Sequence, residues 1–214
     1  MLERVRDKLL SVLYPEGLAC ACCGREAVTD EHGLCEECSG GLELYVASPL
    51  IKNVDGFTAA LVYNDVSGGM VKQLKYNGRR FIAPVLAGFI ELPGELDIDA
   101  VVPVPLYKKR LRERGFNQSE LIAAALCKRY GLRLDNGLIE RAHDTDTQTH
   151  RTAASRRTAL KKAFVADDAC RGLSVLLVDD VRTTGATLSE CAAELKRHGC
   201  KTVYAAAVCF SKDK

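Results

Sequence analysis

The sequence lacks tryptophan and has few aromatic residues, which make up 6% of its 214 residues. It has no apolar run long enough to span a bilayer, so we expect no membrane insertion. Residues 1–10 alternate charge with leucine rather than forming a signal peptide, and we expect a cytoplasmic protein. A formal net charge of +2 does not by itself indicate a nucleic-acid partner, so any such argument has to rest on local clusters of charge.

Cysteine, by contrast, is abundant, with ten residues, and in a cytoplasmic chain this indicates metal binding or buried thiols rather than disulfides. Two Cys-x-x-Cys pairs lie near the N-terminus: Cys20 with Cys23, and Cys35 with Cys38. Four thiolates can enclose one Zn²⁺ tetrahedrally, and the polar segment between the pairs is too short to form a core alone. We therefore predict a structural zinc knuckle whose stability comes from the metal, with Cys22 and His32 as alternative ligands. The scattered cysteines are expected to be small core residues: Cys127, Cys170, Cys191, Cys200 and Cys209.

Length and hydrophobicity suit one full α/β domain together with a small module. Glycine, serine and proline between residues 40 and 49 predict a boundary. We therefore divide the chain into an N-terminal helix and zinc knuckle at residues 1–48 and a larger domain at residues 49–214.

Hydrophobic patterns predict most of the remaining elements. We expect strands at Gly56–Tyr63, Ala163–Val165 and Lys201–Cys209, and helices at Leu2–Leu13, Phe81–Leu92 and Ser119–Tyr130. Asn64–Gly69 is expected to be a turn before a helix that begins near Val71.

The segment Val175–Thr187 is the most informative stretch of the chain. Four apolar residues, Val175–Val178, predict a strand buried on both faces, and Asp179 and Asp180 follow where it would emerge. Small residues then lead into a helix at Thr187–His198, and amides at such a helix start attract phosphate. The two carboxylates would repel phosphate but can accept hydrogen bonds from a vicinal diol near a hydrated Mg²⁺. A diol beside a phosphate indicates a ribose 5-phosphate.

A second candidate anion site follows the buried strand that begins at Ala100 and runs into a loop stiffened by Pro103 and Pro105. Dense cations come next: Lys108, Lys109, Arg110, Arg112 and Arg114. This arrangement indicates a site for pyrophosphate. Lys75, which lies in a further cation-rich run, is expected to form another side of the site. The alternative for each of these residues is a solvated basic helix.

The segment Val175–Thr187 resembles the phosphoribosyl pyrophosphate (PRPP) signature of type I phosphoribosyltransferases. A narrower resemblance, from about Cys20 to the C-terminus, is to the competence-associated ComF family. Its motifs occur here in the same order: Leu74-Lys75-Tyr76-x-Gly78, Val102–Leu106, Arg110–Gln118 and the acid pair. The resemblance implies an α/β fold, a type I phosphoribosyltransferase-like parallel sheet flanked by helices behind a small N-terminal zinc knuckle.

The resemblance also implies roles for individual residues. Asp179 and Asp180 would bind the ribose hydroxyls and carry catalysis, with Mg²⁺ accompanying PRPP. The expected substrate-binding residues are Val181, Arg182, Thr183, Thr184, Gly185, Ala186, Thr187, Lys75, Pro103, Val104, Lys108 and Arg110. The segment that begins at Arg141 stands where such enzymes have a mobile loop, although Arg151 and Ala159 depart from the family pattern.

Two hypotheses follow from the resemblance. The first is a PRPP-dependent phosphoribosyltransferase with an unknown acceptor, linked to DNA uptake and natural competence. The second is a non-catalytic adaptor that binds single-stranded DNA, uses PRPP as a regulatory ligand and meets DNA-uptake proteins. Its expected nucleic-acid contacts are Arg112, Arg114, Phe116, Arg156 and Arg157.

Overall fold

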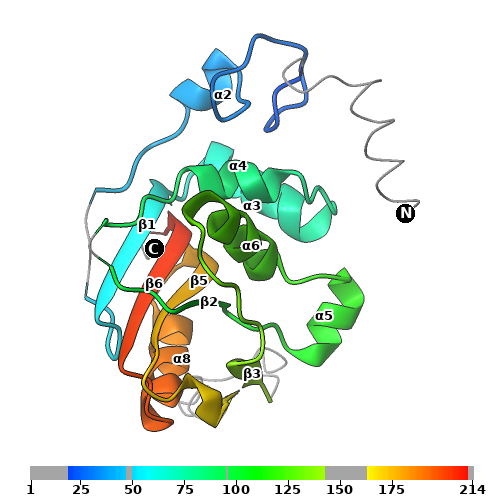
Figure 1. Ribbon diagram of the computed structural model, residues 1–214. Helices are drawn as coiled ribbons and strands as arrows, with labels where there is room; N and C mark the ends of the chain where they lie inside the picture. The colour runs from blue at the N-terminus through cyan, green and yellow to red at the C-terminus, as the bar shows by residue number, and fades with distance from the viewer. Residues whose placement is uncertain (1–18, 47–49, 95, 143–162, 212–214) are drawn as a thin grey trace.

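The computed structural model describes residues 19–46, 50–94, 96–142 and 163–211 of the chain (Figure 1). The helix expected at Leu2–Leu13 lies outside these residues. So do most of the expected mobile loop and, within it, Arg156 and Arg157.

A parallel sheet of four strands forms the centre of the structure, in the order β1-β6-β5-β2. Its strands are β1 (Gly56–Val62), β6 (Thr202–Phe210), β5 (Ser174–Arg182) and β2 (Ala100–Pro103). The central strands β5 and β6 have apolar, buried segments at Val175–Val178 and Ala205–Cys209, as expected for parallel strands covered on both faces. A separate antiparallel pair consists of β3 (Ile139–Arg141) and β4 (Phe164–Ala166). The predicted parallel sheet flanked by helices is confirmed.

Helices cover both faces of the sheet (Figure 1). One face carries α3 (Asp65–Tyr76), α4 (Ile82–Gly88) and α6 (Gln118–Tyr130), and the other carries α8 (Ala186–Arg197). Alternate residues of β5 enter two different cores, because side chains of a strand alternate between faces. Leu176 and Val178 pack with α3, α4 and α6, whereas Val175 and Leu177 pack with α8.

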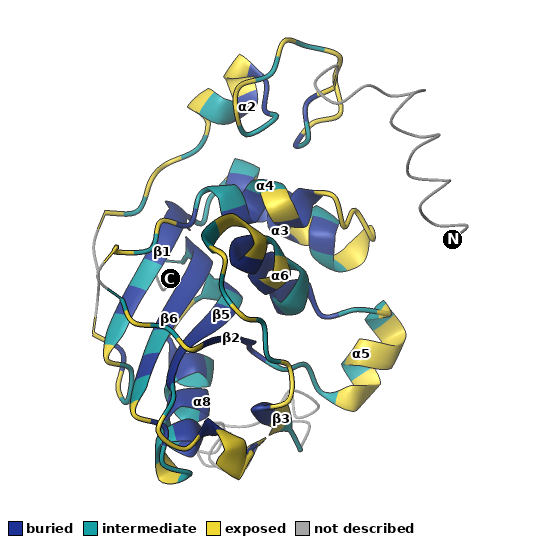
Figure 2. Cartoon of the chain, in the orientation of Figure 1, coloured by how far each residue is buried: buried dark blue, intermediate teal, exposed yellow. Residues whose placement is uncertain are grey.

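Smaller elements lie at the ends of this arrangement. They are α2 (Glu36–Gly40), α5 (Lys108–Arg114) and the 3₁₀ turn η1 (Asp168–Cys170). Figure 2 shows α5 projecting away from the sheet, largely exposed, and it has no buried residue. In the described part of the chain, no helix is both long and apolar enough to cross a membrane.

The turn expected at Asn64–Gly69 is wrong, because α3 already begins at Asp65. The Asn64 side chain accepts hydrogen bonds from the amides of Val66 and Ser67, and Ser67 Oγ accepts one from the Asn64 amide. This reciprocal capping starts the helix six residues earlier than expected. Gly68 serves packing rather than a turn, since a Cβ there would lie 2.6 Å from the Tyr63 ring.

Strand β5 is longer than the four apolar residues that predicted it. It continues through both acids to Arg182, where Asp179 pairs with Ala207 and Arg182 with Phe210 on β6. The acids are therefore part of the sheet rather than of the turn that follows it.

Irregular segments run along both outer strands of the sheet. Beside β1, the amide of Tyr45 donates to the carbonyl of Ala60 at 2.9 Å, and that of Val62 donates to Glu43 at 2.8 Å. Beside β2, Val101 donates to Arg133 and accepts from Asp135, at 2.8 and 2.9 Å. Each outer strand thus has hydrogen-bond partners on its second side.

Candidate functional site

The two acids near the end of β5 already have polar partners. Asp180 is 3% exposed, forms an ion pair with Lys75 on α3 and accepts a hydrogen bond from Gln118 Nε2 at 3.3 Å. Asp179 accepts hydrogen bonds from Ser119 Oγ at 3.0 Å and from the Asp180 amide at 2.9 Å. A buried carboxylate requires such partners, so the pair is held in a fixed position.

Asp179 has a strongly perturbed acidity. Burial of its carboxyl, followed by the neighbouring charge of Asp180, raises the pKa of Asp179 to about 7. The Asp180 amide, Lys75 and Ser119 act in the opposite direction but are outweighed. A carboxyl with this pKa can bind or release a proton near neutral pH, which is common in functional sites.

The start of α6 joins the acids to β2. Gln118 and Ser119, consecutive residues, each donate to one acid. Asn117 caps the helix by accepting from the Ser119 amide at 3.1 Å, and its Nδ2 donates to the carbonyl of Val104 at 3.0 Å. Gln118 and Ser119 were not among the expected site residues. The signal that could have found them is their position directly after an asparagine suited to cap a helix.

The turn between β5 and α8 presents unpaired backbone donors. Among the described residues, no hydrogen bond is found for the amides of Thr183, Thr184, Gly185 and Thr187, whereas Ala186 donates to Thr184 Oγ1 at 3.3 Å. Gly185 has φ +77°, and a Cβ there would lie 3.3 Å from Ile51 and from Arg182 Nε. Amides at the start of a 12-residue helix favour an anionic ligand.

Arg182 contributes a further donor beside this turn. Its guanidinium lies 4.6 Å from the centre of the Phe210 ring, and its Nε is buried without a hydrogen-bond partner in the described structure. A buried N–H without a partner is costly, so this atom also favours an acceptor in the turn.

The expected residues Pro103, Val104 and Val181 lie close to the acids but turn apolar side chains toward the packed interior. Pro103 is the last residue of β2 and pairs with Val178. Val104 is buried, and both of its backbone groups are bonded, because its amide donates to Val178 at 2.9 Å. Val181 packs against the α3–α6 side of the core.

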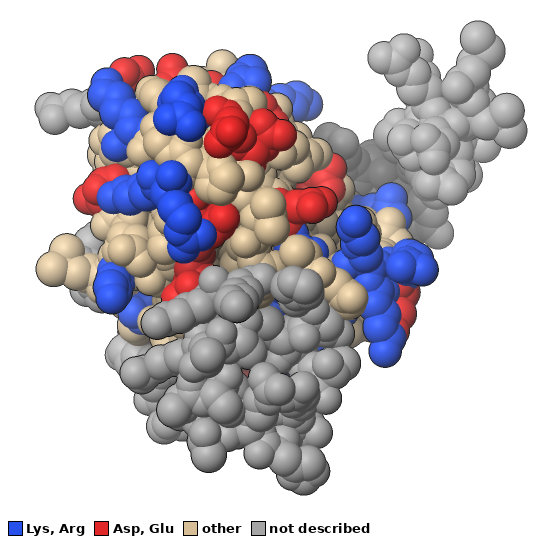
Figure 3. Space-filling model, turned by 90° about the horizontal axis from the view of Figure 1, so that it is seen from below, with Lys and Arg blue, Asp and Glu red and all other residues tan. Residues whose placement is uncertain are grey.

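The basic run after β2 forms α5 and divides into two groups. A cavity of about 500 Å³ lies between α5 and the end of α3. It is lined by Lys75, Tyr76, Asn77, Gly78, Arg110, Glu113, Arg114 and Phe116. Lys108, Lys109 and Arg112 are exposed outside it. Figure 3 shows Lys and Arg gathered on the side of the molecule where α5 projects.

The expected metal cluster is present near the N-terminus. The sulfur atoms of Cys20, Cys23, Cys35 and Cys38 all lie within 4.8 Å of one another. Sulfurs around a tetrahedral Zn²⁺ are about 3.8 Å apart, given a Zn–S bond of about 2.3 Å. The four cysteines could therefore hold a metal ion. The structure leaves both alternative ligands, Cys22 and His32, outside this group.

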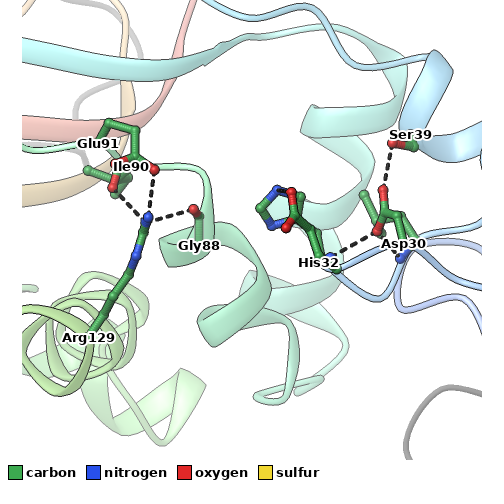
Figure 4. A network of polar contacts seen from close by, with 9 residues as sticks. Asp30, His32, Ser39, Gly88, Ile90, Glu91 and Arg129 are labelled. Carbon is green, nitrogen blue, oxygen red and sulfur yellow. Dashed lines mark hydrogen bonds and ion pairs between the residues drawn. The ribbon is translucent and has the colours of Figure 1, made fainter.

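Hydrogen bonds shape the knuckle, residues 19–46, around these sulfurs. The Arg25 guanidinium donates to Cys23 Sγ at 3.4 Å and lowers the pKa of Cys23 to about 6, which favours the thiolate. Asp30 accepts from the amides of His32 and Leu34 and from Ser39 Oγ (Figure 4).

The knuckle packs on α3 and α4. Gln73 Nε2 on α3 donates to the carbonyl of Cys22 at 2.9 Å, and the His32 ring lies 4.0 Å from that of Phe89. Figure 4 shows His32 beside the end of α4, which Arg129 holds from α6 through the carbonyls of Gly88 and Ile90. Cysteines of the knuckle and Leu74 of α3 belong to one buried cluster.

Comparison with known proteins identifies the larger domain. The family model for the phosphoribosyl transferase domain matches residues 117–214, which include the acids, the turn and α8. The chain is 37% identical over 153 residues to DNA utilization protein YhgH of Salmonella typhimurium, across 65% of each chain. It is 37% identical over 108 residues to competence protein F of Haemophilus influenzae, across 49% of this chain and 47% of that protein.

The chain is also similar to the ComF competence proteins. Competence protein ComFC of Bacillus subtilis is 27% identical over 190 residues, across 86% of this chain and 72% of that protein. The resemblance inferred from the motifs is confirmed, and residues 117–214 match the phosphoribosyl transferase domain. Its match spans 65% of the length of the YhgH protein, just under two thirds.

Solved structures also resemble this chain. Adenine phosphoribosyltransferase (APRTase) from Giardia lamblia, complexed with 9-deazaadenine, gives a TM-score of 0.39 at 15% identity over 83% of this chain and 97% of that chain. Glutamine PRPP amidotransferase from B. subtilis gives 0.40 at 17% identity, over 60% of this chain and 25% of that chain.

Proposed function

We propose that this protein binds PRPP at the end of β5 and transfers its ribose 5-phosphate group to an acceptor. The observation that carries the proposal is the fixed acid pair directly before a turn of unpaired amides. Asp179 and Asp180 would accept hydrogen bonds from the two ribose hydroxyls. The amides of Thr183–Thr187 would bind the 5-phosphate, and Arg182 Nε would supply one more donor.

Phosphoribosyl transfer needs no nucleophile from the protein. As the bond between ribose C1 and pyrophosphate loosens, positive charge develops on the sugar and negative charge on the leaving group. The two acids would offset the positive charge on the sugar. Lys75 and Arg110, which line the cavity beside the acids, would offset the negative charge on the leaving pyrophosphate. Mg²⁺ bound with PRPP would neutralise further charge, and carboxylate oxygens such as those of Asp179 and Asp180 are ligands that it prefers.

The acid pair can be tested by calorimetry with PRPP and Mg²⁺. Asp179→Asn and Asp180→Asn should each abolish measurable PRPP binding, because the amide loses the negative charge and replaces one of the two acceptor oxygens with a donor. Asp168→Asn is the matched control, since that acid is exposed on η1 before β5 begins. Unchanged affinity in the two site variants would refute the assignment.

For the knuckle, we propose that the four cysteines bind one structural Zn²⁺. Four thiolate ligands complete a tetrahedral shell and leave no position open for chemistry. Elemental analysis of carefully purified protein should find about one equivalent of zinc. Less than about half an equivalent would contradict this proposal.

A second function, binding of single-stranded DNA with PRPP as a regulatory ligand, is favoured by the exposed cations of α5 and by the names of the relatives. Lys108, Lys109 and Arg112 lie outside the cavity and are available to phosphates. Arg114 and Phe116, also expected to contact DNA, line the cavity instead. Affinity for an oligonucleotide should then fall steeply with added salt.

Incubation with PRPP, Mg²⁺ and each candidate acceptor separates the two functions. Pyrophosphate release with one acceptor supports transfer. DNA binding without release under any condition supports the adaptor, whose partners would include DNA-uptake proteins.

A further inference from the structure

The cavity between α3 and α5 combines positive charge with aromatic rings. Its wall carries Lys75, Arg110 and Arg114 against a single acid, Glu113. At about 500 Å³ it lies within the range of roughly 300–1,000 Å³ that encloses a whole small ligand. Inorganic pyrophosphate alone would fill only part of it.

Each of the two rings in the cavity wall is paired with a guanidinium. Arg114 lies over Tyr76 at 5.4 Å from the ring centre, and Arg80 lies over Phe116 at 4.9 Å. Tyr76 is nevertheless 73% exposed. An exposed ring fixed beside a guanidinium offers a platform on which a flat base can stack.

The cavity wall reaches the acid pair through two routes. Lys75 forms the ion pair with Asp180. Arg114 donates to Gln118 Oε1, and the amide nitrogen of the same Gln118 donates to Asp180. A ligand in the cavity would therefore lie beside the site proposed for the ribose.

We propose that this cavity binds a nucleoside phosphate, with its base stacked on Tyr76 and its phosphate held by the Arg110 and Arg114 face of α5. A neutral free base would leave unmatched the excess of positive charge in the lining, which holds three cations and one acid, and pyrophosphate would leave the rings without a contact. Binding of this ligand in the cavity does not depend on the proposed transferase function. The ligand is either a free nucleotide or the end of a nucleic-acid strand.

Equilibrium dialysis with the full-length, metal-loaded protein tests the proposal. The probes are thymidine 5′-monophosphate, thymine, inorganic pyrophosphate and a 5′-phosphorylated thymidine pentanucleotide. We expect the monophosphate to bind at least about tenfold more tightly than thymine, because a charged group contributes on the order of that factor. Thymine binding as tightly as the monophosphate would overturn the proposal.

Variants of the cavity wall provide the decisive comparison. Tyr76→Ala should weaken binding of the monophosphate by about fivefold or more, the lower end for a lost stacking contact. Tyr76→Phe should restore it, and Lys128→Gln, which changes an exposed cation on α6 outside the cavity, should leave it unchanged. An unaltered affinity in Tyr76→Ala, together with complete displacement by pyrophosphate, would overturn the proposal.

The remaining outcomes identify the source of the ligand and separate the two proposals. Equal affinity for monophosphate and pentanucleotide supports a free nucleotide, and tighter binding of the pentanucleotide with the same dependence on Tyr76 supports a strand end. Loss of PRPP binding in Asp179→Asn with monophosphate binding retained is the expected result. A wild-type protein that binds PRPP but not the monophosphate or the pentanucleotide would overturn the cavity proposal alone. A wild-type protein that binds the monophosphate or the pentanucleotide but not PRPP would support the cavity proposal and refute the proposed PRPP function.

Discussion

The knuckle and the sheet domain each contain five cysteines, but the two sets are arranged differently. In the sheet domain all five are buried and scattered, and burial raises the pKa of Cys209 to about 12. In the knuckle four sulfurs converge, and Arg25 lowers the pKa of Cys23 instead. The same residue type therefore serves as apolar filling in one region and as a candidate metal ligand in the other. The knuckle should depend on its metal, and the sheet domain on its packing.

The largest effect should come from loss of the metal. A chelator, or Cys38→Ser, should unfold the knuckle, because structural zinc contributes on the order of 10 kcal/mol to small metal domains. Hydrogen exchange should then accelerate at Ala21 and Leu34 while Leu177 in β5 stays protected. Cys22→Ser is the control, since this residue lies between two ligands but outside the cluster. Equal protection of the Ala21 amide with and without chelator would contradict the claim that the knuckle depends on its metal.

Truncation of the two cores should have the next largest effect. Leu74→Ala and Leu177→Ala each remove a fully buried side chain and should lower the free energy of unfolding by about 2–5 kcal/mol in urea. Of these two residues, only Leu74 belongs to the buried cluster that includes the knuckle cysteines. Leu74→Ala should therefore also speed zinc transfer to a chelator. The same acceleration in Leu177→Ala would show that the knuckle responds to general loss of stability.

Acidification should affect the two regions in opposite directions. The folded-state pKa of Asp179, about 7, lies above the unfolded value of about 3.9, so the folded protein holds this proton more tightly. Ionised Asp179 therefore costs stability above pH 7, and this cost disappears as the pH falls from 7 to 4. As the pH falls from 8 to 5, the urea midpoint of the wild type should rise relative to that of Asp179→Asn.

The knuckle should lose metal over the same acid range, because its thiolates become protonated. The difference between wild type and Asp179→Asn removes this shared contribution. A difference in midpoint that does not change with pH would contradict the raised pKa.

The smallest effect concerns the start of α3, the helix on which the knuckle packs. Asn64→Ala removes the cap and should lower the free energy of unfolding by about 1 kcal/mol. The side-chain Nδ2 of Asn64 also donates to the carbonyl of Gly41 at 2.9 Å. Asn64→Asp keeps the cap but loses this donor, so it should retain stability in urea. An equal loss in both variants would place the effect in the contact to Gly41.

Much of this arrangement could be predicted from the sequence, because its signals are local. The cysteine spacing gave the cluster, and the apolar run before Asp179 gave the central strand of the sheet. The turn expected at Asn64–Gly69 was wrong, because Gly68 lies inside α3, where a side chain would meet the Tyr63 ring. Glycine can be required because another group packs closely against the backbone or because the backbone adopts an unusual conformation, and the sequence alone does not distinguish these two reasons.

Contacts between distant segments could not be predicted. Nothing local shows that Lys75 reaches Asp180, or that Gln118 and Ser119 each bind one acid. The basic run after β2 could be recognised, but only its helical form separates Arg110 and Arg114, four residues apart, from the exposed Arg112. The roles assigned to Arg156 and Arg157 remain predictions.

The segments that run beside β1 and β2 have a consequence for the behaviour of this protein in solution. An open sheet usually ends in a row of unsatisfied amides and carbonyls that can recruit a strand from another molecule. Here residues 43–45 occupy one margin and residues 133–135 the other, so the first and last strands offer few vacant groups. The sheet is therefore protected against growth by addition of further strands, and fibre-like self-association through these margins should be disfavoured.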